Sequence, residues 1–155
     1  MKNYVFKIML LAIICFSTPI SANPNYWGGC LDAIGRPVPD IANYWLNDIA
    51  VSHLDYSGNP IIEFNPNIVA NVSIATHRFF YLHECAHHAL GQIVSGTPSS
   101  FFSEQQADCW AINMMKRQGL SSSEFNSIQN HLFSLPGDSS HFHGYIRAPN
   151  LAQCK

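Results

Sequence analysis

Charged side chains are scarce in this chain of 155 residues, and they form no cluster of one sign. Lysine and arginine together number 8 and aspartate and glutamate 10, so charged residues make up only 12% of the sequence. Proteins that bind nucleic acids usually carry a basic patch that contacts the phosphates, and this composition disfavours that class. The sequence also lacks internal repeats, low-complexity tracts and, after its N-terminus, any apolar run long enough to span a membrane.

The N-terminus has the features of a secretory signal peptide. Two lysines supply positive charge, residues 8–16 form a short apolar segment, and small residues precede a cleavage site after Ala22. We therefore expect a signal peptide over residues 1–22 and one secreted or periplasmic domain over residues 23–155. This domain would not stay inserted in a membrane after cleavage, although an uncleaved anchor is the alternative.

Four of the five cysteines lie in the predicted exported domain: Cys30, Cys85, Cys109 and Cys154. An even number of cysteines in an exported chain predicts two disulfides. The spacing does not choose among the three possible pairings. We favour Cys85–Cys109, which would join two predicted helices, together with Cys30–Cys154, which would join the two ends of the domain.

Residues 83–87 carry the metal-binding pattern H-E-x-x-H. On a helix, His83 and His87 lie on one face, so both imidazoles can bind the same metal ion. Zinc is expected because it accepts neutral imidazole and because catalytic zinc sites combine three protein ligands with a water. Glu84 could then take a proton from the zinc-bound water, as in a metallopeptidase. The alternative is a helix with two structural histidines and a solvated glutamate.

The surroundings of this pattern favour a metal site. Residues 73–90 read as one helix that ends at a glycine. A loop at 94–100, rich in serine, glycine and proline, would let a second helix over 100–118 return against the first. Glu104 and Asp108 lie four residues apart on that second helix, so either carboxylate could be the third ligand.

The pattern H-E-x-x-H followed by E-x-x-A-D resembles the gluzincin zinc metallopeptidases, in particular the M48-like group and the small minigluzincins. The resemblance implies that one zinc ion is bound by His83, His87 and Glu104, and that Asp108 orients a ligand histidine. It also implies a peptide or protein substrate.

The remaining segments predict an α+β fold of the small zincin-like type, in which a hairpin or small sheet precedes the metal-binding helix and further helices. Residues 39–47 read as a short helix, and residues 50–56 and 60–64 as a β-hairpin. By the resemblance, the strand 60–64 is the edge that pairs with a peptide substrate. A capping box predicts a third helix over 121–133. Four large residues of the second helix are expected in the core: Phe101, Phe102, Trp110 and Met114.

The segment 140–147 holds a second group of polar residues. The resemblance matches His141 and Arg147 to a histidine and an arginine that border the cleft in the family, although Phe142 replaces the usual proline. Attack on a peptide carbonyl places negative charge on its oxygen, which a cation or an N–H donor stabilises. We expect this catalytic role from one of four residues: His141, His143, Tyr145 and Arg147. The alternative is that Arg147 pairs with a buried acid such as Asp108.

The sequence thus predicts an exported, zinc-dependent metalloendopeptidase that hydrolyses peptide bonds with Glu84 as general base. Two alternatives stay open. One is a zinc-stabilised domain that binds its partner without turnover or blocks its own cleft. The other is hydrolysis of an amide that is not a peptide. The presence of Glu84 favours catalysis, because a purely structural zinc site needs no base there.

Overall fold

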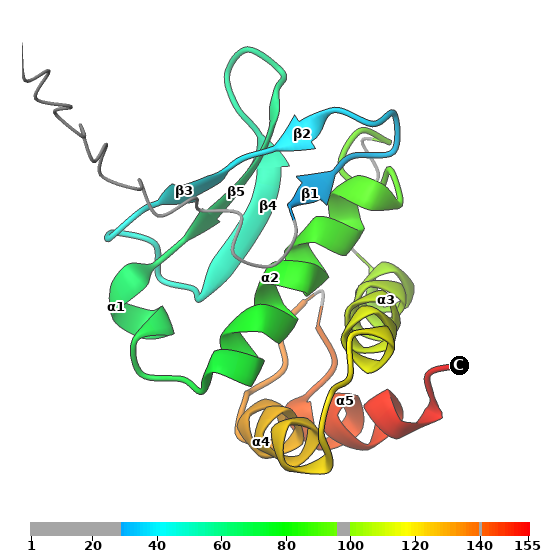
Figure 1. The fold of residues 1–155 in the computed structure, drawn as a ribbon. Helices are drawn as coiled ribbons and strands as arrows, with labels where there is room; N and C mark the ends of the chain where they lie inside the picture. Colours follow the sequence, from blue (N-terminus) through cyan, green and yellow to red (C-terminus); the bar gives the residue numbers. More distant parts are fainter. Residues whose placement is uncertain (1–28, 96–99, 140) are drawn as a thin grey trace, which may run out of the picture.

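The computed structural model describes residues 29–95, 100–139 and 141–155 of the chain. It has the predicted α+β architecture, with a small sheet on one side and helices on the other (Figure 1). The expected signal peptide and its cleavage site lie outside the described residues. Within the described part of the chain, no helix has the length and apolar character needed to cross a membrane.

The main sheet has three strands in the order β3-β5-β4. Strands β4 (Ala50–Leu54) and β5 (Pro60–Phe64) form the predicted antiparallel hairpin, and β3 (Asp40–Ala42) pairs in parallel with β5. The hairpin turn is fixed by Asp55, whose carboxylate accepts N–H bonds from two loop residues. A separate two-stranded ribbon joins β1 (Cys30–Leu31) to β2 (Pro37–Val38).

The sheet corrects two expectations. Residues 39–47 do not form a helix: part of this segment becomes β3, and Trp45 is 91% exposed. The backbone hydrogen bonds available along β5 outweigh the weak helical pattern of this short segment. The pairing with β3 also makes β5 the central strand. The edge strand beside the helix that carries the H-E-x-x-H pattern is therefore β4, and the expectation that residues 60–64 form that edge is wrong.

Three helices occur where the sequence predicts them, because each begins with a serine cap. Ser73, Ser100 and Ser121 each accept an N–H bond from the first turn, and the glycines after the first two helices take positive φ angles. The helical segments are α1 (Pro66–Val69), α2 (Ile74–Ala89), α3 (Phe101–Arg117), α4 (Ser122–Phe133), α5 (Gly144–Asn150) and the short 3-10 turn η1 (Leu151–Gln153).

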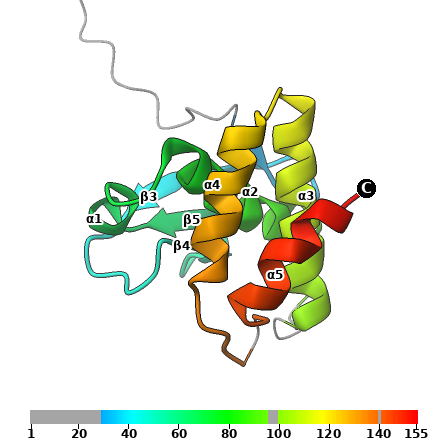
Figure 2. The same ribbon diagram turned by 90° about the horizontal axis from the view of Figure 1, so that it is seen from below.

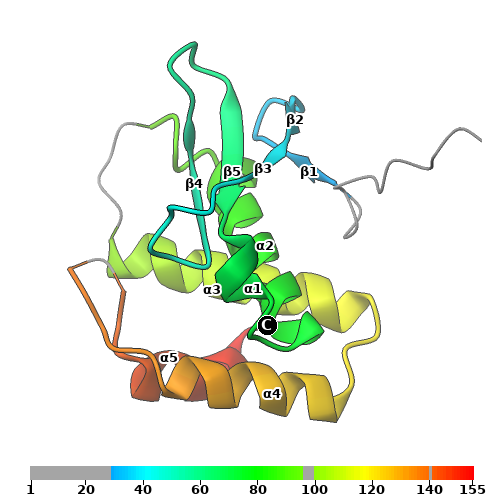
Figure 3. The ribbon, with the colours of Figure 1, turned by 90° about the vertical axis from the view of Figure 1, so that its left-hand side faces the viewer.

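Helix α2 is the centre of the domain. It packs against β4 and β1 on one side and against α3 and α4 on the other, while α4 and α5 lie together as an outer layer (Figures 2 and 3). The small residues Ala86 of α2 and Ala107 of α3 are completely buried, which suits close packing of these two helices.

The core prediction for α3 is half right. Trp110 and Met114 are partly buried and pack against the core. Phe101, at the first position of the helix, is 41% exposed, and Phe102, which lies off the buried stripe, is 70% exposed. The residues of that stripe are Glu104, Ala107, Asp108, Ala111, Ile112 and Met115.

Two disulfides form, as the number of cysteines predicts, but the pairing that we favoured is wrong. Cys30 is joined to Cys85, and Cys109 to Cys154. Cys85 lies two residues from each motif histidine, about 200° around the helix. Since the histidines face α3, Cys85 points away from α3 and toward β1, where Cys30 lies. The two bonds are typical of a protein that folds in an oxidising compartment.

Candidate metal centre

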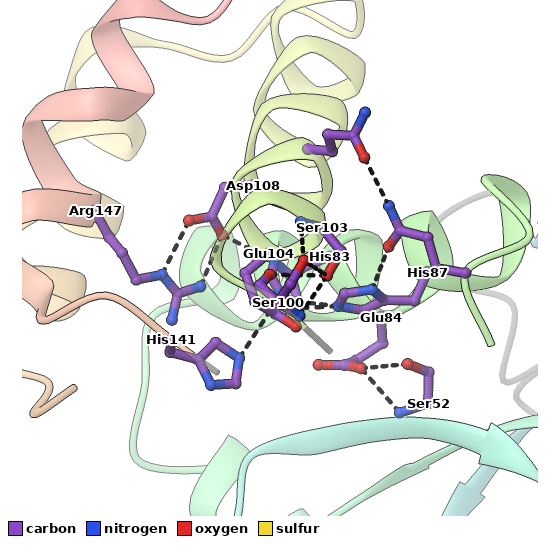
Figure 4. A network of polar contacts seen from close by, with 12 residues as sticks. Ser52, His83, Glu84, His87, Ser100, Ser103, Glu104, Asp108, His141 and Arg147 are labelled. Atoms are coloured by element: carbon purple, nitrogen blue, oxygen red, sulfur yellow. Dashed lines mark hydrogen bonds and ion pairs between the residues drawn. The ribbon is translucent and has the colours of Figure 1, made fainter. Parts of the chain in front are cut away.

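Two turns of α2 and the first turn of α3 bring three metal-binding side chains together (Figure 4). The Nε2 atoms of His83 and His87 lie 3.2 Å apart. One carboxylate oxygen of Glu104, Oε2, lies 3.0 Å from Nε2 of His83 and 3.4 Å from Nε2 of His87. All three residues are buried.

These separations match the edges of a zinc coordination tetrahedron. Bonds of about 2.0–2.1 Å from zinc to its ligands place neighbouring ligand atoms roughly 3.3–3.4 Å apart. Without a cation, the lone pairs of two imidazole nitrogens and a carboxylate oxygen would repel one another at such distances, so protons or a metal ion must lie between them. The donor set of two imidazoles and one carboxylate is one that zinc accepts.

Asp108 takes a different position from Glu104. Its Oδ1 atom lies 2.8 Å from Nδ1 of His83, on the side of the ring away from Glu104. Arg147, from α5, donates two hydrogen bonds to the same carboxylate, at 2.7 and 2.9 Å. Of the two acids left open by the sequence, Glu104 therefore lies next to both Nε2 atoms, and Asp108 orients the His83 ring.

A close approach between two helices places Arg147 on Asp108. Gly144, at the start of α5, lies against the end of α4, where any Cβ atom would overlap the carbonyl oxygen of Leu132. The N–H of Gly144 also donates to the carbonyl of Leu135. A glycine at this position therefore lets α5 pack close enough for the guanidinium to reach α3.

His141 approaches the centre from the segment before α5. Its Nε2 atom lies 2.9 Å from Oε2 of Glu104, and its Nδ1 atom lies 2.9 Å from the carboxylate of Asp138. The ligand atoms of His83, Glu104 and His141 all lie within 4.8 Å of one another. A stacked contact between Phe142 and Phe101, with ring centroids 4.3 Å apart, joins this segment to α3.

The charges of the centre depend on these contacts. Burial raises the pKa of Glu104, but hydrogen bonds from His141, His83 and His87 outweigh it and hold the pKa well below its ordinary value. Burial lowers the pKa of His83, but bonds to Asp108 and Glu104 outweigh it and raise the pKa to about 10. In the metal-free chain the His83 imidazole therefore carries a proton that a metal ion would replace.

Glu84 lies beside the ligands but faces the sheet. Its Oε2 atom accepts two hydrogen bonds from Ser52 of β4, one from the backbone N–H at 2.8 Å and one from the hydroxyl at 2.7 Å. The carboxylate is buried and held at the boundary between α2 and the edge strand. These two bonds hold the carboxylate in one position on α2, next to the first motif histidine.

A cleft of about 800 Å³ opens onto the centre. One wall is β4 with the residues before it, and the other is the start of α3 with the segment around His141. Six of the predicted site residues line it: His83, Glu84, His87, Glu104, His141 and Arg147. Its apolar lining includes Ile49, Val51, Phe80, Ile93, Phe102 and Leu135. The volume is in the range of ligand-binding clefts.

The structure brings together nearly all of the site residues that the sequence singles out. His143 and Tyr145 are exceptions: their rings contact each other beside the start of α5, and neither residue lines the cleft. Three partners of the site were missed by sequence reasoning: Ser52, Gln92 and Asp138. The only local signal for any of them was the position of Gln92 directly after the glycine that ends α2.

Comparisons with protein-family models, with curated proteins and with solved structures find no match to this chain.

Proposed function

We propose that the chain is a zinc-dependent metallopeptidase of the gluzincin type. The observation that carries the proposal is the convergence of His83, His87 and Glu104, whose ligand atoms lie 3.0–3.4 Å apart. Zinc, when bound to these residues, polarises a carbonyl group and lowers the pKa of water. The cleft above the centre gives a substrate access to it.

The neighbouring side chains supply the remaining chemistry. Glu84 accepts a proton from the attacking water and delivers it to the leaving amine, and Ser52 keeps its carboxylate in place. His141, with its ring directed into the cleft, donates a hydrogen bond to the oxygen on which negative charge develops. Arg147 acts through Asp108, which holds the ring of His83.

The substrate binds as an extended strand along β4. Ser52 directs its backbone N–H away from β5, so the outward edge of β4 faces the cleft. An exposed edge offers backbone groups to a peptide in the manner of an added strand. This geometry favours a peptide or unfolded segment of a protein over a folded surface.

The protein acts outside the cytoplasm in this proposal. The N-terminal pattern is that of a signal peptide, and the two disulfides suit an oxidising compartment. Both bonds attach directly to the site, because Cys85 lies between the two motif histidines and Cys109 follows Asp108.

A second candidate function rests on His141. Its Nε2 atom lies so close to Glu104 that the imidazole closes the centre from the cleft side. A domain in which this histidine stays in place would bind zinc and a partner without turnover, or would be a latent enzyme.

The deciding experiment compares the exported wild-type protein with Glu84→Gln on a library of peptides, with the zinc content of both measured. We expect one zinc per chain in each protein and cleavage by the wild type alone, reduced in the variant by roughly 10²–10⁴-fold. Glu63→Gln, which removes a carboxylate outside the cleft, is the matched control. Cleavage by Glu84→Gln would contradict the role of the base, and zinc without cleavage in the wild type would favour the second candidate.

A further inference from the structure

We propose that Gln92 is a positioning residue for the metal centre, which orients the ring of His87 as Asp108 orients that of His83. The inference rests on the proposed zinc site. The side-chain oxygen of Gln92 lies 2.7 Å from Nδ1 of His87. An N–H bond from Nδ1 to this oxygen leaves Nε2 of the ring directed at Glu104, as a metal ligand requires.

The end of helix α2 delivers Gln92 to this position. Gly91 takes a φ of +71°, its N–H donates to the carbonyl of His88, and the N–H of Gln92 donates to the carbonyl of His87. These two bonds form a Schellman motif, in which a glycine reverses the chain at a helix end. The residue after the glycine is thereby bonded through its backbone to the same histidine that its side chain contacts.

A second contact accompanies this orientation of the amide. The amide nitrogen of Gln92 donates to the side-chain oxygen of Gln106, on α3, at 3.1 Å. Rotation of the amide by 180° would place two donors against each other at His87 and two acceptors against each other at Gln106. Gln106 lies two residues after Glu104, so the two glutamines form a bridge between the helices that carry the ligands.

A neutral amide at this position has a chemical consequence. Glu104 and Glu84 already bring two carboxylates to the centre, and Asp108 adds a third that is paired with Arg147. Gln92 orients its histidine without adding another negative charge, so less of the zinc charge is neutralised and more is available to act on water. A glutamate at position 92 would keep the orientation and add the charge.

The side chain can be tested separately from the fold. Substitution Gln92→Ala removes the amide but keeps the backbone N–H that completes the helix end. The dissociation constant for zinc is measured by chelator competition for the wild type, Gln92→Ala, Gln92→Glu and Gln106→Ala. The matched control is Gln105→Ala, which removes an exposed glutamine from α3, the helix that carries Gln106. Spectra of the cobalt-substituted proteins report the ligand geometry independently of activity.

We expect Gln92→Ala to weaken zinc binding by about 10–100-fold and to alter the cobalt spectrum. Gln92→Glu should bind zinc at least as tightly as the wild type, Gln106→Ala should lose less than Gln92→Ala, and Gln105→Ala should match the wild type. Equal zinc affinities for wild type and Gln92→Ala would overturn the inference. Weaker zinc binding by Gln92→Glu than by the wild type would overturn it too. The glutamate variant therefore tests the inference even if the alanine variant does not fold. A wild type that binds no zinc would overturn the proposed function as well.

Discussion

Ser52 holds one oxygen of Glu84 with two donors, its backbone N–H and its hydroxyl, at 2.8 and 2.7 Å. The contact joins the edge strand β4 to α2, the helix that carries two of the proposed zinc ligands. The proposed general base is therefore positioned by the same strand along which a substrate would bind in our proposal. Since the N–H of Ser52 is already engaged, a docked peptide must pair with the other outward groups of this edge.

In the proposed mechanism, the hydroxyl of Ser52 helps to hold the base in place. We expect Ser52→Ala to lower kcat by roughly tenfold, the effect of losing one hydrogen bond to a charged group, and to leave KM and zinc content unchanged. Ser52→Thr, which keeps a hydroxyl, should recover most of the activity. Steady-state kinetics on a peptide substrate measure both constants, and an unchanged kcat in Ser52→Ala would show that the backbone N–H alone positions the base.

The register of the hairpin predicts which backbone groups a substrate uses. Ser52 and Ile62 face each other, and the N–H of Ser52 points outward, so the N–H of Ala50, two residues away, lies on the same outward edge. A proline on an edge strand is tolerated where its missing N–H would face away from the sheet. We expect Ala50→Pro to raise KM several-fold with little change in kcat or zinc content.

The matched control for this prediction is Leu54→Pro. Leu54 lies on the same edge of β4 but outside the cleft lining. An equal rise in KM for both variants would indicate a general disturbance of the strand, and no rise in either would contradict docking along β4.

His141 separates the two candidate functions. If it stabilises the developing oxyanion, His141→Ala should keep one zinc per chain and lower kcat by about 10²–10³-fold. If it blocks the centre, the same substitution should raise the activity or weaken zinc binding. Zinc titration and peptide kinetics on one preparation distinguish these results. His143→Ala, two residues along and outside the cleft lining, should behave as the wild type.

Local signals explain how much of this structure could be predicted from the sequence. Several predicted features depend on residues within a few positions of one another: helix α2 and the glycine that ends it, the capped helices and the hairpin turn. The strand β3 does not: Asp40–Ala42 becomes a strand only because β5 offers it a partner that lies about 20 residues away in the sequence.

The disulfide pairing was predicted wrongly for a different reason. Helical geometry alone places Cys85 on the side of α2 opposite to His83 and His87, and those histidines must face the helix that supplies the third ligand. The favoured bond from Cys85 to Cys109 on that helix therefore conflicts with the helical geometry on which the proposed metal site rests, and the structure pairs Cys85 with Cys30 instead. What the sequence could not supply was the partner, because nothing local to Cys30 places it beside α2.

Arg147 gives the clearest prediction for stability. Its guanidinium and the carboxylate of Asp108 are both buried, so Arg147→Met leaves that buried carboxylate paired with His83 but without the arginine. The variant should lower the free energy of unfolding at pH 7 by about 3 kcal/mol. Arg36→Met is the control: the side chain of Arg36 is partly exposed, and its partner Asp32 keeps two backbone N–H donors when the arginine is removed, so the substitution should cost far less. Urea denaturation of the metal-free proteins measures both differences.

The pH dependence of this difference tests its cause. Burial raises the pKa of Asp108, but its bonds with His83 and Arg147 outweigh this and bring the folded-state pKa to about 2, below the ordinary 3.8. A carboxylate whose pKa is lower in the folded chain than in the unfolded chain stabilises the fold at any pH above its unfolded-state pKa. This stabilisation is lost as the pH falls through its folded-state pKa. The difference in the free energy of unfolding between wild type and Arg147→Met should therefore be full at pH 7 and shrink below pH 4, as the Asp108 carboxylate of the variant takes up a proton. A gap that stays constant from pH 7 to pH 3 would mean that Arg147 stabilises the domain by packing rather than by its charge.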